Sequence, residues 1–376
     1  SFVLRPPLPS WLRCLAAMAR EHETVASPSA GLDPSRDVPQ DSVPSDVEFG
    51  DANIEELQRQ LAVKRAEAAA IEKQIEAAKQ SSALESSHRP LSIVIPMGGL
   101  GDAFAEAGFR FPRPLVNIVG RPVLMWLLDH LSIQPHDVVI LVVPAIMDRQ
   151  YGISKMFTAH FPAHNMRVVA LPFETRGWVE TLFTVVRQMA PKELRHPLVT
   201  LDCSTIYHGT DLLARCRRLP SGTGASVYFE AEPSQLAANG SVASQFSYLE
   251  LDDQENVTDI REKAVISTHA NTGGYIFPSG RHFRAAAERL LEAPERLAQT
   301  GLYASALISA MLELQERFVG LRVRWDEFAI CATPHQLEAF IRRVSSGTVR
   351  MARSMRFCFD LDGTLVTEPR VAGDLA

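Results

Sequence analysis

Three closely spaced glycines follow an apolar run that has the pattern of a buried strand. The run covers residues 91–96, and Gly98, Gly99 and Gly101 come next, with Asp102 directly after them. Glycine lets a backbone approach a polyphosphate closely and direct its N–H groups toward it. The spacing matches neither GxxxxGK[ST] nor GxGxxG, so a Walker A loop is excluded and a dinucleotide-binding turn is disfavoured. The residues indicate a phosphate-binding loop of another kind, with a plain strand-to-helix turn as the alternative.

Basic residues and a second turn follow these glycines. Arg113 lies between two prolines, Gly-Arg-Pro occupies 120–122, and an apolar helical pattern covers 123–131. The whole stretch 97–131 closely resembles the opening motif of sugar-phosphate nucleotidylyltransferases, the NTP-transferase family. Five further segments resemble that family in the same order, at residues 176–181, 201–207, 260–263, 270–277 and 332–337. The resemblance covers residues 91–343.

The resemblance implies a transferase. In that family an acceptor phosphate attacks the α-phosphorus of a nucleoside triphosphate, and pyrophosphate leaves. We therefore expect transfer of a nucleoside monophosphate to a sugar phosphate or a similar phosphorylated small molecule. Both reactants are anionic, so catalysis depends on charge neutralisation and in-line positioning. The family also uses Mg²⁺, which bridges the phosphates.

The same resemblance assigns roles to individual residues. It makes Asp202 the metal ligand, and Arg113 and Lys263 the catalytic cations. The nucleotide-binding residues are then Gly98, Gly99, Gly101, Asp102, Gly177, Trp178 and Glu180, and the acceptor-binding residues are Glu262, Asn271, Thr272 and Gly273. Trp178 has two interpretations, stacking on a nucleotide base or filling a core gap beside Phe173.

Three positions lack charges that the family's pattern carries. Ala103 stands where the loop arginine is expected, Ser204 where close relatives have a second carboxylate, and Thr268 where relatives often have Asp. Removing one preorganised charge-stabilising donor typically costs about 10²–10³ in rate. Two hypotheses therefore stay open. The chain is a nucleotidyltransferase with a partly degenerate site, or it is a catalytically impaired module that binds a nucleotide or nucleotide sugar or acts as a scaffold.

A second acidic motif lies near the end of the sequence. An apolar strand pattern at 357–361 contains Asp360 and leads into Asp362-Gly-Thr, so the residues read DxDGT. This resembles the first motif of haloacid-dehalogenase-like (HAD-like) phosphatases, which implies Asp360 as nucleophile and Asp362 as proton shuttle. We expect residues 355–376 to be the truncated start of such a domain. A third hypothesis is then a bifunctional protein whose activity is that of the phosphatase.

The N-terminal part differs in composition. Residues 1–50 are rich in Pro, Ser and Asp after the first twenty, and we expect them to be disordered. A helix is expected over 51–82, starting near Asn53, and a linker over 83–90. Apolar or small residues follow a heptad seam broken by Lys64, at Ile54, Leu57, Leu61, Ala68, Ile71, Ile75 and Ala78. The helix either forms a coiled coil through which the protein self-associates, over 54–78, or packs on its own domain.

Strand and helix patterns alternate over residues 91–345, the expected nucleotidyltransferase-like domain. This predicts an α/β fold, a Rossmann-like, mostly parallel sheet with helices on both faces. Expected helices cover residues 123–131, 179–189 and 281–291, and expected strands cover residues 91–96, 138–143, 168–172, 198–201, 225–231, 246–251 and 273–277. Ligands of such sheets bind at the carboxyl ends of the strands, where the glycines lie.

Bulk properties exclude other classes. The net charge of the 376 residues is −6, and no long basic run occurs, so no nucleic-acid partner is expected. No apolar run reaches the roughly 18–20 residues of a membrane helix, so no membrane association is expected. The five cysteines are scattered without a CxxC pair, which favours a reducing compartment. We expect a cytoplasmic protein.

Overall fold

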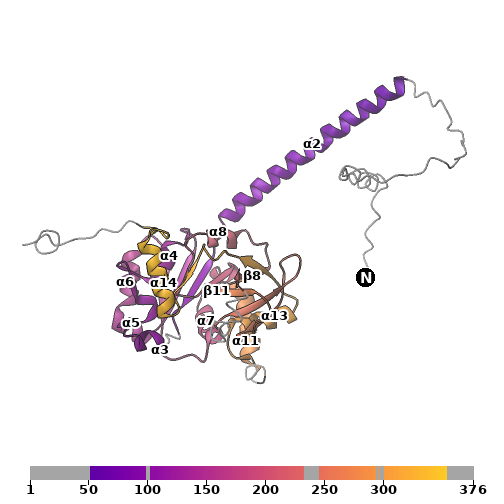
Figure 1. The fold of residues 1–376 in the computed structure, drawn as a ribbon. Helices are drawn as coiled ribbons and strands as arrows, with labels where there is room; N and C mark the ends of the chain where they lie inside the picture. Colours follow the sequence, from indigo (N-terminus) through magenta and orange to yellow (C-terminus); the bar gives the residue numbers. More distant parts are fainter. Residues whose placement is uncertain (1–50, 99–101, 233–244, 294, 296–299, 354–376) are drawn as a thin grey trace, which may run out of the picture. The chain divides into compact units, whose positions relative to one another are not determined.

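The structure is a computed structural model that describes residues 51–98, 102–232, 245–293, 295 and 300–353 (Figure 1). The chain forms two compact units, Ser1–Ile71 and Glu72–Ala376. The expected disordered segment 1–50, Gly99 and Gly101, and the C-terminal segment with Asp360 and Asp362 lie outside the described residues. Within the described ranges, no helix combines the length and apolar character needed to span a membrane.

The first element is a long helix, α2 (Asp51–Ser87). It begins two residues before Asn53 and continues through 83–87, where a linker was expected. No glycine or proline interrupts these 37 residues, and Pro90 follows shortly after the last turn. The side chains of Leu61, Ile71 and Ile75 are 51%, 56% and 49% exposed.

A nine-stranded sheet forms the centre of the described α/β unit, in the order β10-β9-β11-β6-β1-β4-β5, with β8 pairing β11 and β12. Its parallel part contains β1 (Ser92–Pro96), β4 (Val138–Pro144), β5 (Met166–Leu171) and β6 (Leu198–Leu201). The remaining strands are β8 (Thr223–Glu230), β9 (Ser247–Leu251), β10 (Val257–Glu262), β11 (His269–Phe277) and β12 (Arg317–Arg322). The α/β fold with its parallel central strands confirms the expected fold class.

Helices cover both faces of this sheet and create two apolar cores (Figure 1). One core packs α4 (Val123–Asp129), α6 (Ile153–His160) and α14 (Pro334–Ser345) against the sheet. The other packs α7 (Trp178–Val186), α11 (Gly280–Leu291) and α13 (Ala304–Glu313). Strands buried on both faces need continuous apolar runs, which is why β1 and β4 were visible in the sequence.

Shorter elements connect these layers. They are α3 (Asp102–Glu106), η1 (Arg113–Leu115), β2 (Asn117–Ile118), β3 (Arg121–Pro122), α5 (Ala145–Tyr151), η2 (Glu193–Arg195), β7 (Thr205–Ile206), α8 (Leu212–Arg217) and β13 (Ala329–Ile330). The strand β13 pairs with β7, which places Ile330 opposite Thr205. This pairing joins the segment that follows β6 to the segment that precedes α14.

Two strands of the nine-stranded sheet, β10 and β12, were missing from the expected set, as were the two-residue strands β2, β3, β7 and β13. The sequence of β10 is VTDIRE, and only two of its six residues, Val257 and Ile260, are buried. It lies at the edge of the sheet and pairs with one neighbour, β9, in the antiparallel sense. A half-exposed edge strand carries charged residues on its solvent face, so its apolar signal is weak.

A buried ion pair stabilises the segments that lead into the parallel strands β1 and β4. Asp137 and Arg217 are 0% and 1% exposed, and the guanidinium donates a hydrogen bond to Asp137 Oδ2. The same carboxylate accepts the N–H groups of Leu91 (2.9 Å) and Gln134 (2.7 Å). It therefore joins helix α8 to the segments that enter β1 and β4.

We expect Arg217→Ala to lower the free energy of unfolding by about 3–5 kcal/mol, because it leaves the Asp137 carboxylate buried without its cation. Urea denaturation followed by circular dichroism measures the effect. The matched control is Arg218→Ala, since Arg218 is the exposed neighbour of Arg217. Equal stability of the two variants would contradict this role.

Candidate functional site

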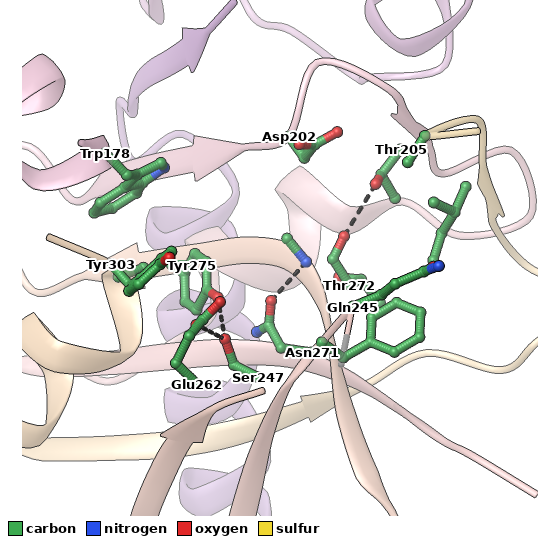
Figure 2. Close-up of a pocket in the computed structure, with 15 residues that line it drawn as sticks. Trp178, Asp202, Thr205, Gln245, Ser247, Glu262, Asn271, Thr272, Tyr275 and Tyr303 are labelled. Carbon is green, nitrogen blue, oxygen red and sulfur yellow. Dashed lines mark hydrogen bonds between the residues drawn. The ribbon is translucent and has the colours of Figure 1, made fainter. Parts of the chain in front are cut away.

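A cavity of about 230 Å³ opens where β6 ends beside β11 (Figure 2). The strands β6 and β1 are parallel neighbours, so this cavity lies at the edge where the phosphate loop was expected. Its lining residues are Trp178, Asp202, Thr205, Gln245, Phe246, Ser247, Glu262, Asn271, Thr272, Gly273, Tyr275, Tyr303, Ala304, Ile330 and Ala332. Six of the residues predicted from the sequence lie in this lining, namely Trp178, Asp202, Glu262, Asn271, Thr272 and Gly273.

The backbone of Gly273 lies against Asp202. The register of β11 shifts between Asn271 and Gly274, and within this bulge Gly273 adopts a φ of +87°. The Asp202 N–H donates to the Gly273 carbonyl at 3.0 Å. A Cβ atom on residue 273 would lie 2.7 Å from the Asp202 Cβ, so glycine is needed both for the conformation and for the close approach.

Buried polar groups fix this bulge. The Asn271 amide oxygen accepts the Gly273 N–H (2.6 Å), and its nitrogen donates to Ser226 Oγ (2.6 Å). Thr272 Oγ1 contacts Tyr207 Oη at 2.8 Å and donates to the Val227 carbonyl at 3.1 Å. The side chains of Asn271 and Thr272 are therefore bonded within the protein, and they position the cavity wall.

The carboxylate of Asp202 is held by Ser204 at one oxygen. Oδ1 accepts the Ser204 N–H at 2.8 Å and the Ser204 hydroxyl at 2.5 Å. Oδ2 lies 3.9 Å from an Arg113 nitrogen, and the Asp202 side chain is 41% exposed. Ser204 is fully buried. It stands where the family's pattern has a second metal-binding carboxylate, and in this protein its hydrogen bonds orient Asp202.

Arg113 supplies a positive charge beside Asp202. It begins the turn η1 between two prolines, and its side chain is 14% exposed. Its Nε has no hydrogen-bond partner within the described residues. Burial lowers the pKa of Arg113, but the nearby Cys203 and Asp202 raise it above the usual value, so the guanidinium stays charged. Burial raises the pKa of Cys203 to about 11, which keeps this thiol neutral.

The residues around Asp202 offer few ligands for a divalent cation. Among the described residues, no group of three His, Cys, Asp or Glu side chains can enclose a metal ion. Mg²⁺ is, however, often bound by one or two carboxylates together with substrate phosphates and water. Asp202 Oδ2 is accessible from the cavity and suits such a single contact.

Glu262 lies on the other side of the cavity from Asp202 (Figure 2). It is the last residue of β10, and its Oε2 accepts hydrogen bonds from Ser247 (2.6 Å) and Ser305 (2.9 Å). Within the described residues no side chain bonds Oε1. Two hydroxyls therefore orient the carboxylate and leave one oxygen for a ligand.

Aromatic rings form one wall between the two carboxylates. The rings of Trp178 and Tyr275 are 5.8 Å apart at 65°, and Trp178 also contacts Phe277 and Phe283. Trp178 is thus packed against the core and also borders the cavity. Phe173 is not part of this core, because it is 54% exposed. Tyr303, 40% exposed, completes this wall and was not found by sequence reasoning.

Lys263 does not line the cavity that contains Asp202. Its backbone has a φ of +55°, and its ammonium lies 3.5 Å from Tyr303 Oη and 5.1 Å from the ring centre. It borders an adjacent cavity of about 390 Å³, which also touches Glu262 and Tyr303. Tyr303 therefore separates the predicted catalytic lysine from Asp202.

Other predicted residues do not line this cavity in the described part of the chain. Gly98 is exposed just beyond β1, and Asp102 begins α3. Gly177 approaches Leu302 so closely that an added Cβ would lie 2.6 Å from the Leu302 Cβ. Glu180 accepts hydrogen bonds from the Arg176 side chain and N–H, and the side-chain bond in particular lowers the pKa of Glu180.

The three positions that lack the charges of the family's pattern lie in different parts of the fold. Ala103 is exposed in α3. Thr268 borders a separate hollow, together with Glu230 and Trp325, and its carbonyl accepts the Ala231 N–H. Of the three, Ser204 alone touches a residue of the Asp202 cavity within the described part of the chain.

Solved structures share this fold. A nucleoside-diphosphate-sugar pyrophosphorylase from Vibrio cholerae RC9 is 18% identical with a TM-score of 0.52, over 66% of this chain and 99% of that one. A UDP-glucose pyrophosphorylase from Acinetobacter baumanii is 15% identical with a TM-score of 0.50, over 69% and 95%. A UDP-glucose pyrophosphorylase complexed with UDP-glucose is 13% identical with a TM-score of 0.51, over 68% and 98%.

No family model and no curated protein matches the chain. At these low identities the structural likeness establishes the fold, an α/β domain with a mostly parallel central sheet.

We expect Gly273→Ala to destabilise the protein more than Gly222→Ala. Both residues have positive φ, +87° and +77°, but an added Cβ meets nothing within 4 Å at Gly222. The shared backbone strain costs about 1–2 kcal/mol, and the contact with Asp202 adds to it at Gly273. Equal losses of unfolding free energy in urea would show that the close approach is unimportant.

Proposed function

We propose that this protein transfers a nucleoside monophosphate from a nucleoside triphosphate to a phosphorylated acceptor such as a sugar phosphate. The observation that carries the proposal is the pair of oriented carboxylates, Asp202 and Glu262, on opposite sides of one cavity at the edge where β6 ends. One carboxylate has a buried guanidinium beside it, and the other has a free oxygen. Such an arrangement suits a phosphate at one end and a hydroxylated acceptor at the other.

The phosphate end contains Asp202 and Arg113. An acceptor phosphate oxygen forms a bond to the α-phosphorus, the bond from that phosphorus to the bridging oxygen breaks, and pyrophosphate leaves. The Arg113 guanidinium is permanently charged and next to the cavity residue Asp202. It stabilises negative charge on the phosphates, as fixed cations do in phosphoryl and nucleotidyl transfer. Asp202 would hold Mg²⁺, which supplies further neutralisation when bound.

The acceptor end contains Glu262 and the aromatic wall. Glu262 Oε1 accepts a hydrogen bond from a hydroxyl of the acceptor, since Ser247 and Ser305 already donate to Oε2. Trp178 and Tyr303 present apolar ring surface on which a sugar ring or a base packs. The acceptor is then fixed by one charged hydrogen bond and by ring contact.

The test is pyrophosphate release on incubation with each nucleoside triphosphate, Mg²⁺ and a panel of sugar 1-phosphates. We expect release with at least one combination. Glu262→Gln should raise the acceptor KM about 10–100-fold, the worth of one hydrogen bond to a charged group, with a small effect on the nucleotide KM.

The matched control is Glu230→Gln, because Glu230 is a half-exposed carboxylate outside this cavity that pairs with Arg322. No release with any combination, or equal acceptor KM values for both variants, would contradict the proposal.

A second candidate is a module that binds a nucleotide sugar without turnover. Two residues favour this candidate. The Ser204 hydroxyl donates to Asp202, and Ala103 stands where the family's loop has a positively charged arginine. Calorimetric titration with nucleotide sugars should then show binding that Asp202→Asn and Glu262→Gln weaken, while pyrophosphate release is absent. Turnover at ordinary enzyme rates would exclude this candidate.

A further inference from the structure

The cavity between Asp202 and Glu262 is lined by two carboxylates and, within the described residues, by no Lys, Arg or His side chain. The two carboxylates differ in their surroundings. Asp202 has the Arg113 guanidinium beside it. The half-buried Glu262 carboxylate is bonded by the hydroxyls of Ser247 and Ser305 and forms no ion pair in the described part of the chain. The Glu262 end of the cavity therefore carries an uncompensated negative charge.

The basic residues on either side of Glu262 in the sequence do not supply the missing cation. The Lys263 ammonium lies against the Tyr303 ring, 5.1 Å from its centre, and borders the adjacent cavity. Arg261 pairs with Asp259 at 2.7 Å. A carboxylate that is partly withdrawn from water attracts a cation more strongly than one in bulk solvent. The charge of Glu262 is thus left for a ligand.

Aromatic rings surround the same end of the cavity. Figure 2 shows three rings on the same side of the cavity as Glu262, namely those of Trp178, Tyr275 and Tyr303. A chain of contacts joins the rings to the carboxylate, because Tyr275 Oη lies 3.4 Å from the Ser247 hydroxyl, which donates to Glu262. The faces of Trp and Tyr rings attract cations, and organic ammonium groups are commonly recognised in this way. The wall therefore suits a positively charged group.

We propose that the Glu262 end of the cavity binds an ammonium group in preference to a neutral hydroxyl, so that the acceptor is a small phosphorylated amine. This inference rests on the proposed function, which places the acceptor at Glu262. A neutral hydroxyl satisfies the free oxygen of Glu262 but not its charge. An ammonium compensates the charge and also lies against the faces of the aromatic rings.

The two ends of the cavity then have opposite charge requirements. The Arg113 guanidinium favours an anion beside Asp202, whereas Glu262 favours a cation at the other end. An acceptor with a phosphate at one end and an ammonium at the other matches both. The reversed orientation would place the phosphate against Glu262, and like charges brought together across an interface are strongly unfavourable. Charge therefore also determines which end of the acceptor points toward the nucleotide.

Calorimetric titration of the full chain tests this inference with pairs of ligands that differ in one charge. The first pair is choline phosphate and neohexyl phosphate, in which carbon replaces the ammonium nitrogen. The second pair is glucosamine 1-phosphate and glucose 1-phosphate, in which a hydroxyl replaces the ammonium. Mg²⁺ and the α,β-methylene analogue of each nucleoside triphosphate are present, so that a nucleotide can bind and no transfer occurs.

We expect the ammonium-bearing member of at least one pair to bind about tenfold more tightly than its neutral partner, which corresponds to a desolvated cation–π contact together with the charge of Glu262. The pair with the larger ratio distinguishes an amino alcohol from an amino sugar as the acceptor. Because the ratio compares two ligands on one protein, a general loss of stability does not change it.

Variants show which residues produce the preference. Glu262→Gln keeps the shape and removes the charge, so the ratio should fall to about threefold or less, and Tyr303→Leu should lower it about threefold. The matched controls are Glu230→Gln and Trp325→Leu, since both residues are exposed or half-exposed and line a separate hollow. The controls should leave the ratio unchanged.

Equal affinities within both pairs would overturn the inference while leaving the proposed function intact. A preference that Glu262→Gln does not reduce would overturn it as well, because the preference would then arise elsewhere. Failure of all four phosphorylated ligands to bind, together with the absence of pyrophosphate release, would contradict the proposed function and the inference with it.

Discussion

The close approach between the Gly273 backbone and Asp202 is the contact on which the geometry of the cavity depends. β6 ends at Leu201, and the residue after it donates its N–H to Gly273, so the Asp202 carboxylate is placed by a backbone contact. The bulge that brings Gly273 there exists because Asn271 and Thr272 satisfy their polar groups within the protein. Buried polar groups without partners are costly, so these hydrogen bonds stabilise the bulge.

The rest of the cavity follows from how the two parts of the sheet meet. Asp202 comes from the end of the parallel strands, whereas Glu262 comes from the edge of the antiparallel strands. β11 lies between them and pairs with both β6 and β9. Helix α13 then adds Ser305, which orients Glu262, and Tyr303 directly precedes its first turn. The spacing of the two carboxylates is therefore set by strand order and register.

The strands β1, β4 and β6 could be predicted from the sequence, since strands buried on both faces need unbroken apolar runs. β10 and β12 could not, because their exposed faces carry charges. In the site, Asp202 and Gly273 were found through local motifs. Ser247 and Ser305 were not, because they lie 15 and 43 residues from Glu262 and meet it only through strand register and helix packing. Lys263 follows Glu262 in the sequence, but Tyr303 separates it from Asp202. Lys263 and Tyr303 are 40 residues apart, so no local sequence pattern indicates their contact.

The proposed function requires that one cavity hold a phosphate group at Asp202 and a hydroxylated acceptor at Glu262. A crystal structure of the protein with a bound nucleotide sugar is the decisive experiment. We expect the diphosphate beside Asp202 and Arg113, and a hydroxyl of the sugar on the free oxygen of Glu262. A nucleotide sugar bound elsewhere on the α/β unit, with this cavity empty, would contradict it.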